Sequence, residues 1–194
     1  MSTLIDNDAQ VSPLGEQLKS ERIRRGWATD ELARRSGVSR AMISKVERGE
    51  SSPTALLLGR LSAAFGLTMS QLMVRADGRR GLKSSREQQP GWIDPETGFT
   101  RRNLTPDEGP ATPLELSWVE LPPRASVSYP AGAYAFIDDQ QVVVIDGELR
   151  VAQGDKAYDL AAGDCLRLGP PADCTFSNRG RGQCRYMVAV LRSG

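Results

Sequence analysis

The chain has 194 residues, with 25 lysines and arginines, 24 aspartates and glutamates, three cysteines and no histidine, and this length gives room for one or two compact domains. Three cysteines without a Cys-x-x-Cys spacing argue against a disulfide scaffold, and no run approaches the 18 apolar residues of a membrane span. The polar start MSTLIDNDAQ lacks the pattern of a signal peptide, so we expect a cytoplasmic protein without a membrane attachment.

The charge is unevenly distributed along the chain. Residues 1–105 carry 17 basic and 12 acidic side chains, whereas residues 106–194 carry 8 basic and 12 acidic ones. A basic front followed by an acidic rear suits a nucleic-acid reader joined to a domain of another kind. The bias is mild, so affinity for DNA would depend on a local patch and on dimerisation.

Residues 29–50, TDELARRSGVSRAMISKVERGE, predict two short helices joined by a tight turn. Gly37 suits the left-handed residue that ends one helix, and Ser39 suits the N-cap of the next. A helix set at a sharp angle to its predecessor is how compact domains insert a helix into the DNA major groove. The segment therefore predicts a DNA-binding protein; the alternative is an ordinary helical hairpin with a solvated basic face.

The second of these helices has two distinct faces. At 100° per residue, one face is expected to pack inward and carries Ser39, Ile43, Val46 and Glu47. The other face is expected to point away from the core and carries Ala41, Ser44, Lys45 and Arg48, with Arg40 between the faces in the first turn. Cationic side chains attract phosphate or contact guanine, serine forms hydrogen bonds, and alanine allows close approach to a thymine methyl group.

Residues 14–73 resemble the helix-turn-helix domain of the phage-repressor (Cro-like, XRE) family through LGEQLKSERIRRG, ELARRSGVSRAMISKVERG and SPTALLLGRLSAAFGLTMSQLM. The resemblance implies a lambda-repressor-like domain with five helices, near 13–25, 29–36, 39–48, 53–65 and 69–74. Ser12-Pro13 and Ser52-Pro53 fit N-cap and first-turn positions. The expected core is made of apolar side chains, namely Leu14, Leu18, Leu32, Ala33, Val38, Ile43, Val46, Leu57, Leu61, Leu67 and Leu72.

The resemblance also implies roles for single residues. Arg22 and Glu47 occupy positions at which family members often form an ion pair between the first and third helices; the alternative is two unpaired surface charges. Many members begin the second helix with Ser-Gln, where this chain has Ala28-Thr29, so Thr29 is expected to cap that helix or to donate to a phosphate. We expect specificity from Arg40, Ala41, Ser44 and Lys45, and phosphate contacts from Thr29, Ser39 and Arg48.

After the fifth helix the composition changes. Residues 75–91 are polar and rich in basic residues, which predicts a linker between a domain at 12–74 and a domain at 92–194. From Trp92 onward short strand-like runs alternate with turns, which are expected at residues 94–98, 146–147 and 161–164. Many short strands separated by glycine and proline are typical of an all-β sandwich or barrel.

Residues 112–192 resemble a cupin, a double-stranded jelly roll, through VVVIDGELRVAQGDKAYDLAAGDCLRLGPPADCTFSN. Metal-binding cupins carry histidines and a glutamate at positions that correspond here to Tyr134 and Phe136 (or one residue earlier), Gln140 and Cys174. A glutamine and a cysteine do not supply the ligands expected for iron, manganese or zinc, and no histidine is present as a general base. We therefore expect no metal, no cofactor and no catalytic residue in this domain.

The interior of the cupin-like domain is the expected place for a ligand. By strand alternation, Gln140 and Val142 share one face, and Cys174 and Phe176 share another. The hypothesis is a pocket for a small organic effector, lined by Tyr134, Phe136, Gln140, Val142, Cys174 and Phe176. The alternative is a barrel that is filled by its own side chains and serves only in dimerisation. The three cysteines, Cys165, Cys174 and Cys184, are expected to be ordinary core residues; the alternative is a redox switch at Cys174, which the cations Arg167 and Arg185 would favour.

Together these features resemble a class of one-component bacterial transcription regulators with a two-domain α + β fold. The expected protein is a homodimer on double-stranded DNA, with two recognition helices about 34 Å apart in successive major grooves of a pseudo-palindromic operator. Two alternatives remain open. One is a DNA-binding or toxin-neutralising protein whose cupin only dimerises, and the other is a cupin enzyme tethered to DNA.

Overall fold

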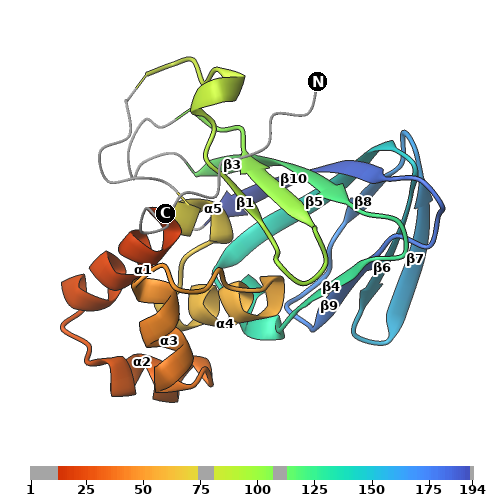
Figure 1. Ribbon diagram of the computed structural model, residues 1–194. Helices are drawn as coiled ribbons and strands as arrows, with labels where there is room; N and C mark the ends of the chain where they lie inside the picture. Colours follow the sequence, from red (N-terminus) through yellow and green to blue (C-terminus); the bar gives the residue numbers. More distant parts are fainter. Residues whose placement is uncertain (1–12, 74–80, 107–112, 193–194) are drawn as a thin grey trace.

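The computed structural model describes residues 13–73, 81–106 and 113–192. The first of these ranges forms the helices α1 (Pro13–Arg24), α2 (Thr29–Ser36), α3 (Arg40–Glu47), α4 (Ala55–Phe65) and α5 (Met69–Met73). These helices gather at one end of the molecule and the strands form the rest (Figure 1). Each helix begins and ends within two residues of its expected range, so the five-helix prediction is confirmed. None of the described helices is long and apolar enough to cross a membrane.

Two helix starts differ from the sequence expectation. Thr54 is the N-cap of α4, where its hydroxyl accepts a hydrogen bond from the Leu57 amide at 3.3 Å. Ser52 instead accepts a hydrogen bond from the Trp92 indole, so the capping role predicted for Ser52-Pro53 is wrong. Ala28, not Thr29, lies at the N-cap of α2. The Ser12 cap expected for α1 lies outside the described residues.

The described residues from Gly91 onward form two antiparallel sheets. The strands are β1 (Gly91–Ile93), β2 (Thr100–Asn103), β3 (Leu114–Leu121), β4 (Ser126–Tyr129), β5 (Ile137–Asp146), β6 (Glu148–Gln153), β7 (Lys156–Ala161), β8 (Cys165–Arg167), β9 (Cys174–Ser177) and β10 (Cys184–Arg192). One sheet has the order β1-β2-β3-β10-β5-β8 and the other β4-β9-β6-β7. The eight strands from β3 to β10 form two four-stranded sets, β3-β10-β5-β8 and β4-β9-β6-β7, which is the strand order of a jelly roll and confirms the predicted cupin-like fold.

The three predicted turns join strands as expected. In the turn after β1, the Asp94 carboxylate accepts hydrogen bonds from the Glu96 amide and the Thr97 hydroxyl. Between β5 and β6, Gly147 has a φ of +83°, a conformation that glycine adopts without steric cost. In the third turn the Ala161 amide donates to the Asp164 carboxylate at 2.8 Å. The first of these turns joins two paired strands, whereas the other two lead the chain from one sheet to the other.

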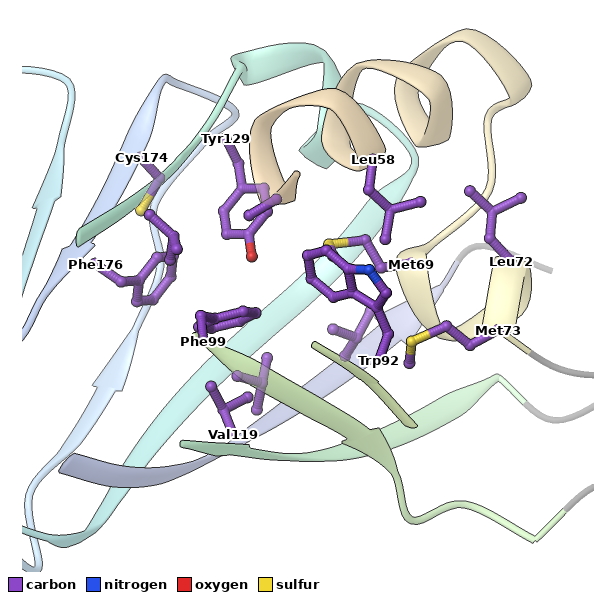
Figure 2. Packing of buried hydrophobic residues seen from close by; sticks show 14 of the residues in the cluster. Leu58, Met69, Leu72, Met73, Trp92, Phe99, Val119, Tyr129, Cys174 and Phe176 are labelled. Atoms are coloured by element: carbon purple, nitrogen blue, oxygen red, sulfur yellow. The ribbon is translucent and has the colours of Figure 1, made fainter. Parts of the chain in front are cut away.

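The helical domain packs directly against the open end of the jelly roll. Helix α4 contacts β4 and the 3₁₀ turn η2 (Ala131–Tyr134), and α5 contacts β2. Gly59 of α4 lies so close to the Tyr129 ring that a Cβ atom at Gly59 would be 2.9 Å from Tyr129 Cδ1. Figure 2 shows Leu58 and Met69 from the helices facing Trp92 of β1 and Phe99, which directly precedes β2. One continuous apolar core therefore joins the two domains.

Polar contacts also join the helical domain to the strands at this interface, which we call the seam. The Thr68 hydroxyl donates to the Glu115 carboxylate at 2.6 Å, and the Ser70 and Ser117 hydroxyls lie 3.1 Å apart. The Ala55 amide at the start of α4 donates to the Asp94 carboxylate at 3.3 Å. The expected linker, residues 75–91, is described only from residue 81, where it contains the short 3₁₀ turn η1 (Arg86–Gln88).

Candidate functional site

The turn between α2 and α3 has the geometry expected for a helix-turn-helix. Gly37 adopts φ +66°, and its amide donates to the Ala33 carbonyl at 2.9 Å. Ser39 is the N-cap of α3, where its hydroxyl accepts a hydrogen bond from the Met42 amide at 3.3 Å. The buried Ser36 hydroxyl bridges the turn, because it donates to the Leu32 carbonyl and accepts from the Val38 amide. The predictions for Gly37 and Ser39 are confirmed.

The inward face of α3 is close to the one expected. Ile43 and Val46 are each 1% exposed and Glu47 is 8% exposed. Gly15 of α1 permits close packing here, since a Cβ atom at that position would lie 2.3 Å from the Val46 carbonyl oxygen. The expectation that Ser39 packs inward is wrong, because Ser39 is exposed at the helix start, where it caps the chain.

The outward face of α3 presents the side chains proposed to contact DNA. Ala41, Lys45 and Arg48 are exposed, Arg40 is exposed beside them, and Ser44 is half-buried. Arg40 pairs with Asp30 at 3.1 Å and Arg48 pairs with Glu50 at 2.5 Å, both through exposed side chains. Lys45 forms no ion pair with any residue in the described ranges. Lys45 is therefore free to contact DNA. Arg40 and Arg48 would have to leave the exposed carboxylates of Asp30 and Glu50 to bind a DNA phosphate or base.

The start of α2 lies near this face. Thr29 is half-buried in the first turn, and the Ala28 N-cap has no side-chain hydrogen bond. Asp30 and Glu31 occupy the first turn, where carboxylates are stabilised by the helix dipole. Hydrogen bonds from Arg34 and Arg35 lower the pKa of Glu31 to about 2. Because Arg34 and Arg35 are bound to Glu31, the Thr29 hydroxyl is the candidate phosphate donor at the start of α2.

A two-pronged ion pair anchors α3 to α1. Arg22 Nε and Nη2 donate to the two carboxylate oxygens of Glu47 at 2.7 and 2.8 Å, and Arg22 Nη1 donates to the Trp27 carbonyl at 2.9 Å. The Arg22 and Glu47 side chains are 13% and 8% exposed. The hydrogen bonds from Arg22 to Glu47 raise the pKa of Arg22. Because the pair is bidentate and buried, it holds α3 in a fixed position against α1.

A stack of aromatic and cationic side chains braces the same region, and the sequence analysis did not find it. The Trp27 and Phe65 rings stack with centroids 5.7 Å apart, and the guanidinium groups of Arg25 and Arg35 lie over the Trp27 ring at 5.7 and 4.4 Å. Arg25 also donates to the Phe65 carbonyl at 2.8 Å. The stack of Trp27 on Phe65 is not visible as a spacing in the sequence, because the two residues are 38 positions apart.

A cavity of about 50 Å³ lies at the seam between α5 and the jelly-roll interior. Its lining comes from both domains: Thr68, Met69, Phe99, Arg101, Tyr129, Ala133, Tyr134, Ile137, Gln140, Phe176, Tyr186, Val188 and Val190. Of the proposed pocket residues, Tyr134, Gln140 and Phe176 line this cavity, whereas Phe136, Val142 and Cys174 do not. Arg101, Thr68 and Met69 were not among the predicted pocket residues, because they reach the barrel interior only through the packing of the domains.

The residues at the metal positions of cupins do not form a set that fits a divalent metal. Gln140 offers a neutral amide, and burial raises the pKa of the Cys174 thiol to about 11, so this thiol is protonated near neutral pH. Burial also raises the pKa of Tyr134. No group of three histidine, cysteine, aspartate or glutamate side chains is placed to share an ion among residues 13–73, 81–106 and 113–192.

The cysteines differ in environment. Cys174 and Cys184 are buried, and burial raises the pKa of the Cys184 thiol to about 11. Cys165 is exposed, so the expectation that it is a core residue is wrong. It lies on the edge strand β8, where the neighbouring Leu166 takes the more buried position.

Comparison with known proteins agrees with this architecture. Residues 18–72 match the helix-turn-helix family HTH_3. The chain is 27% identical over 179 residues to the HTH-type transcriptional regulator SutR of Escherichia coli (strain K12). The aligned region covers 88% of each protein. It also resembles the crystal structure of an HTH_3 family transcriptional regulator from Vibrio cholerae, with a TM-score of 0.76, 24% identity, and coverage of 95% of this chain and 97% of that one. Residues 18–72 therefore belong to the HTH_3 helix-turn-helix family, and the whole chain shares its fold with a regulator that contains such a domain.

Proposed function

We propose that this protein is a sequence-specific DNA-binding transcription regulator that inserts α3 into the major groove. The observation that carries the proposal is the outward face of α3, whose opposite face is fixed in the core. This outward face carries the half-buried Ser44 and four exposed residues, Arg40, Ala41, Lys45 and Arg48. The match of residues 18–72 to a helix-turn-helix family and the regulators among its relatives support this function.

The contacts divide by chemistry. Arg40, Ala41, Ser44 and Lys45 lie where a recognition helix reaches base edges, and they supply the sequence preference. Thr29, Ser39 and Arg48 set the position of the helix on phosphates. The Ser39 hydroxyl can cap α3 and bind a phosphate at the same time, because its oxygen accepts from the Met42 amide while its proton remains free to be donated. A homodimer would place two such helices on a pseudo-palindromic operator.

The test compares Lys45→Ala with Lys156→Ala, which removes an exposed lysine from the distant strand β7 (Figure 1). A duplex selected from a random pool by the full-length protein is the specific target, and a shuffled duplex is the competitor. Lys45→Ala should weaken binding to the selected duplex by about 1–3 kcal/mol and narrow the preference over the shuffled one. Lys156→Ala should leave both affinities unchanged. Equal affinities of the two variants for the selected duplex would contradict the proposal.

The jelly roll makes this regulator responsive to a small effector in the seam cavity. The support is that Thr68 and Met69 of the DNA-binding domain line the same cavity as Tyr129, Gln140 and Phe176 of the barrel. A ligand held there would contact both domains at once. An inert barrel that only dimerises predicts instead that no small molecule changes operator affinity.

A further inference from the structure

Arg101 is a buried cation with no ion-pair partner among residues 13–73, 81–106 and 113–192. It is 9% exposed, and the alternation along β2 turns it inward between Thr100 and Arg102. Its Nε atom is buried without a hydrogen-bond partner, and no ion pair joins its guanidinium to another residue of the described ranges. Buried charges are costly unless they are paired, so an arginine in this state is placed to receive an anion.

The two carboxylates that are buried in the described strand region, Asp94 and Glu115, already have other partners. Asp94 accepts hydrogen bonds from the Glu96 amide, the Thr97 hydroxyl and the Ala55 amide. Glu115 accepts from the Thr68 hydroxyl and pairs with Arg192 at 2.8 Å. Neither carboxylate lines the cavity, and among the described residues that line it Arg101 alone carries a formal charge at neutral pH.

Two more polar side chains, Tyr129 and Gln140, line the cavity beside Arg101. The Tyr129 hydroxyl is buried without a hydrogen-bond partner in the described ranges, and burial raises its pKa, so it remains a neutral donor. Figure 2 shows this hydroxyl oxygen pointing into the space beside Phe99 and Phe176. The 8%-exposed Gln140 adds an amide group to the lining. Two buried donors without partners, on different strands, therefore line one small cavity.

The rest of the lining sets the shape and chemistry of the ligand. Ile137, Val188, Val190 and the Phe176 ring form an apolar wall that can cover a short hydrocarbon group. A cavity of this size holds about three to five water molecules, which is the space of a ligand with a few heavy atoms. Sulfate or phosphate would need donors on all sides, which the apolar wall does not offer, whereas a carboxylate presents a planar anion to the guanidinium and a tail to that wall.

We propose that the seam cavity binds a short aliphatic monocarboxylate, with Arg101 as its counter-ion and the Tyr129 hydroxyl as a second donor. The binding site stands on the geometry alone; that its occupancy alters DNA affinity rests on the proposed function. The carboxylate would connect Arg101 of β2 with Tyr129 of β4 across the cavity, which Met69 of α5 and the preceding Thr68 line from the helical domain.

Titration calorimetry of the full-length protein in a carboxylate-free buffer tests the site without DNA. The probes are propionate, its neutral isostere propionamide, and sulfate. Wild-type protein should bind propionate about tenfold or more tightly than propionamide or sulfate, because the charge-assisted hydrogen bonds need both the carboxylate and the arginine. Arg101→Met should weaken propionate binding by a similar factor, and Tyr129→Phe by a smaller one. Arg102→Met, which changes the neighbouring side chain on the opposite face of β2, should bind as the wild type does.

Melting temperatures of the ligand-free variants separate a binding arginine from a structural one. Arg101→Met should melt no lower than the wild type, because it removes an unpaired buried charge. A large loss of stability in Arg101→Met would overturn the assignment, as would wild-type protein that takes up no propionate or prefers sulfate or propionamide. Unchanged propionate affinity in Tyr129→Phe would remove the second donor. The DNA-binding proposal fails on different data, namely the Lys45→Ala comparison in the absence of propionate.

Discussion

Replacing Glu47 by glutamine tests how α3 is held in place. The substitution keeps the shape of the side chain but leaves the Arg22 guanidinium, 13% exposed, without its counter-charge. Removing one partner of a buried pair typically costs about 3–5 kcal/mol, and glutamine keeps one acceptor oxygen, so we expect a loss of about 3 kcal/mol in the free energy of unfolding. For a chain of this length that loss corresponds to a drop in melting temperature of about 6–12 °C.

The matched control is Glu50→Gln, which breaks the exposed pair between Arg48 and Glu50. That variant should melt at the wild-type temperature, because exposed pairs are screened by solvent. Combining Arg22→Met with Glu47→Gln should restore part of the lost stability, since no uncompensated buried charge remains. Thermal denaturation followed by circular dichroism gives all three values. If Glu47→Gln and Glu50→Gln melt at the same temperature, the pair does not anchor α3.

Two further predictions concern the seam and the cysteines. Gly59→Ala should destabilise the protein by about 1–3 kcal/mol, because its new methyl group would meet the Tyr129 ring at 2.9 Å, whereas Gly182→Ala, which has no close neighbours, should be tolerated in the same denaturation experiment. Iodoacetamide at pH 8 should alkylate Cys165 in the native protein and spare Cys174, which is buried and whose pKa is raised to about 11; mass spectrometry that finds Cys174 modified at the same rate would contradict the packing described here.

The helical domain was predictable because its signals are local. Gly37, Ser39 and the apolar spacing of α3 each specify backbone conformation or burial within a few residues, and the structure agrees with them. The errors lie where two neighbouring residues compete for the same role. Thr54 caps α4 in place of Ser52, because the Ser52 hydroxyl is bound by the Trp92 indole from a strand 40 positions later.

The cavity was only half predictable for the same reason. Tyr134, Gln140 and Phe176 follow from the strand pattern of the jelly roll. Arg101 precedes the strands that carry the cupin resemblance, and as a basic residue in a polar stretch it reads as a surface side chain. Only the packing of α5 against β2 turns it into a buried cation. Contacts between domains leave no periodic pattern in the sequence. The strand pattern therefore predicted three lining residues of the barrel but not the buried charge of Arg101.

The most direct measurement of the central claim is the affinity of the full-length protein for a selected duplex and for a shuffled one, across a salt titration. The selected duplex should bind at least about 10³-fold more tightly at physiological salt, and Arg48→Ala should weaken binding to both duplexes alike and flatten the salt dependence. Lys45→Ala should instead reduce the ratio between them. Equal affinity of the wild-type protein for both duplexes would contradict the reading of α3 as a recognition helix.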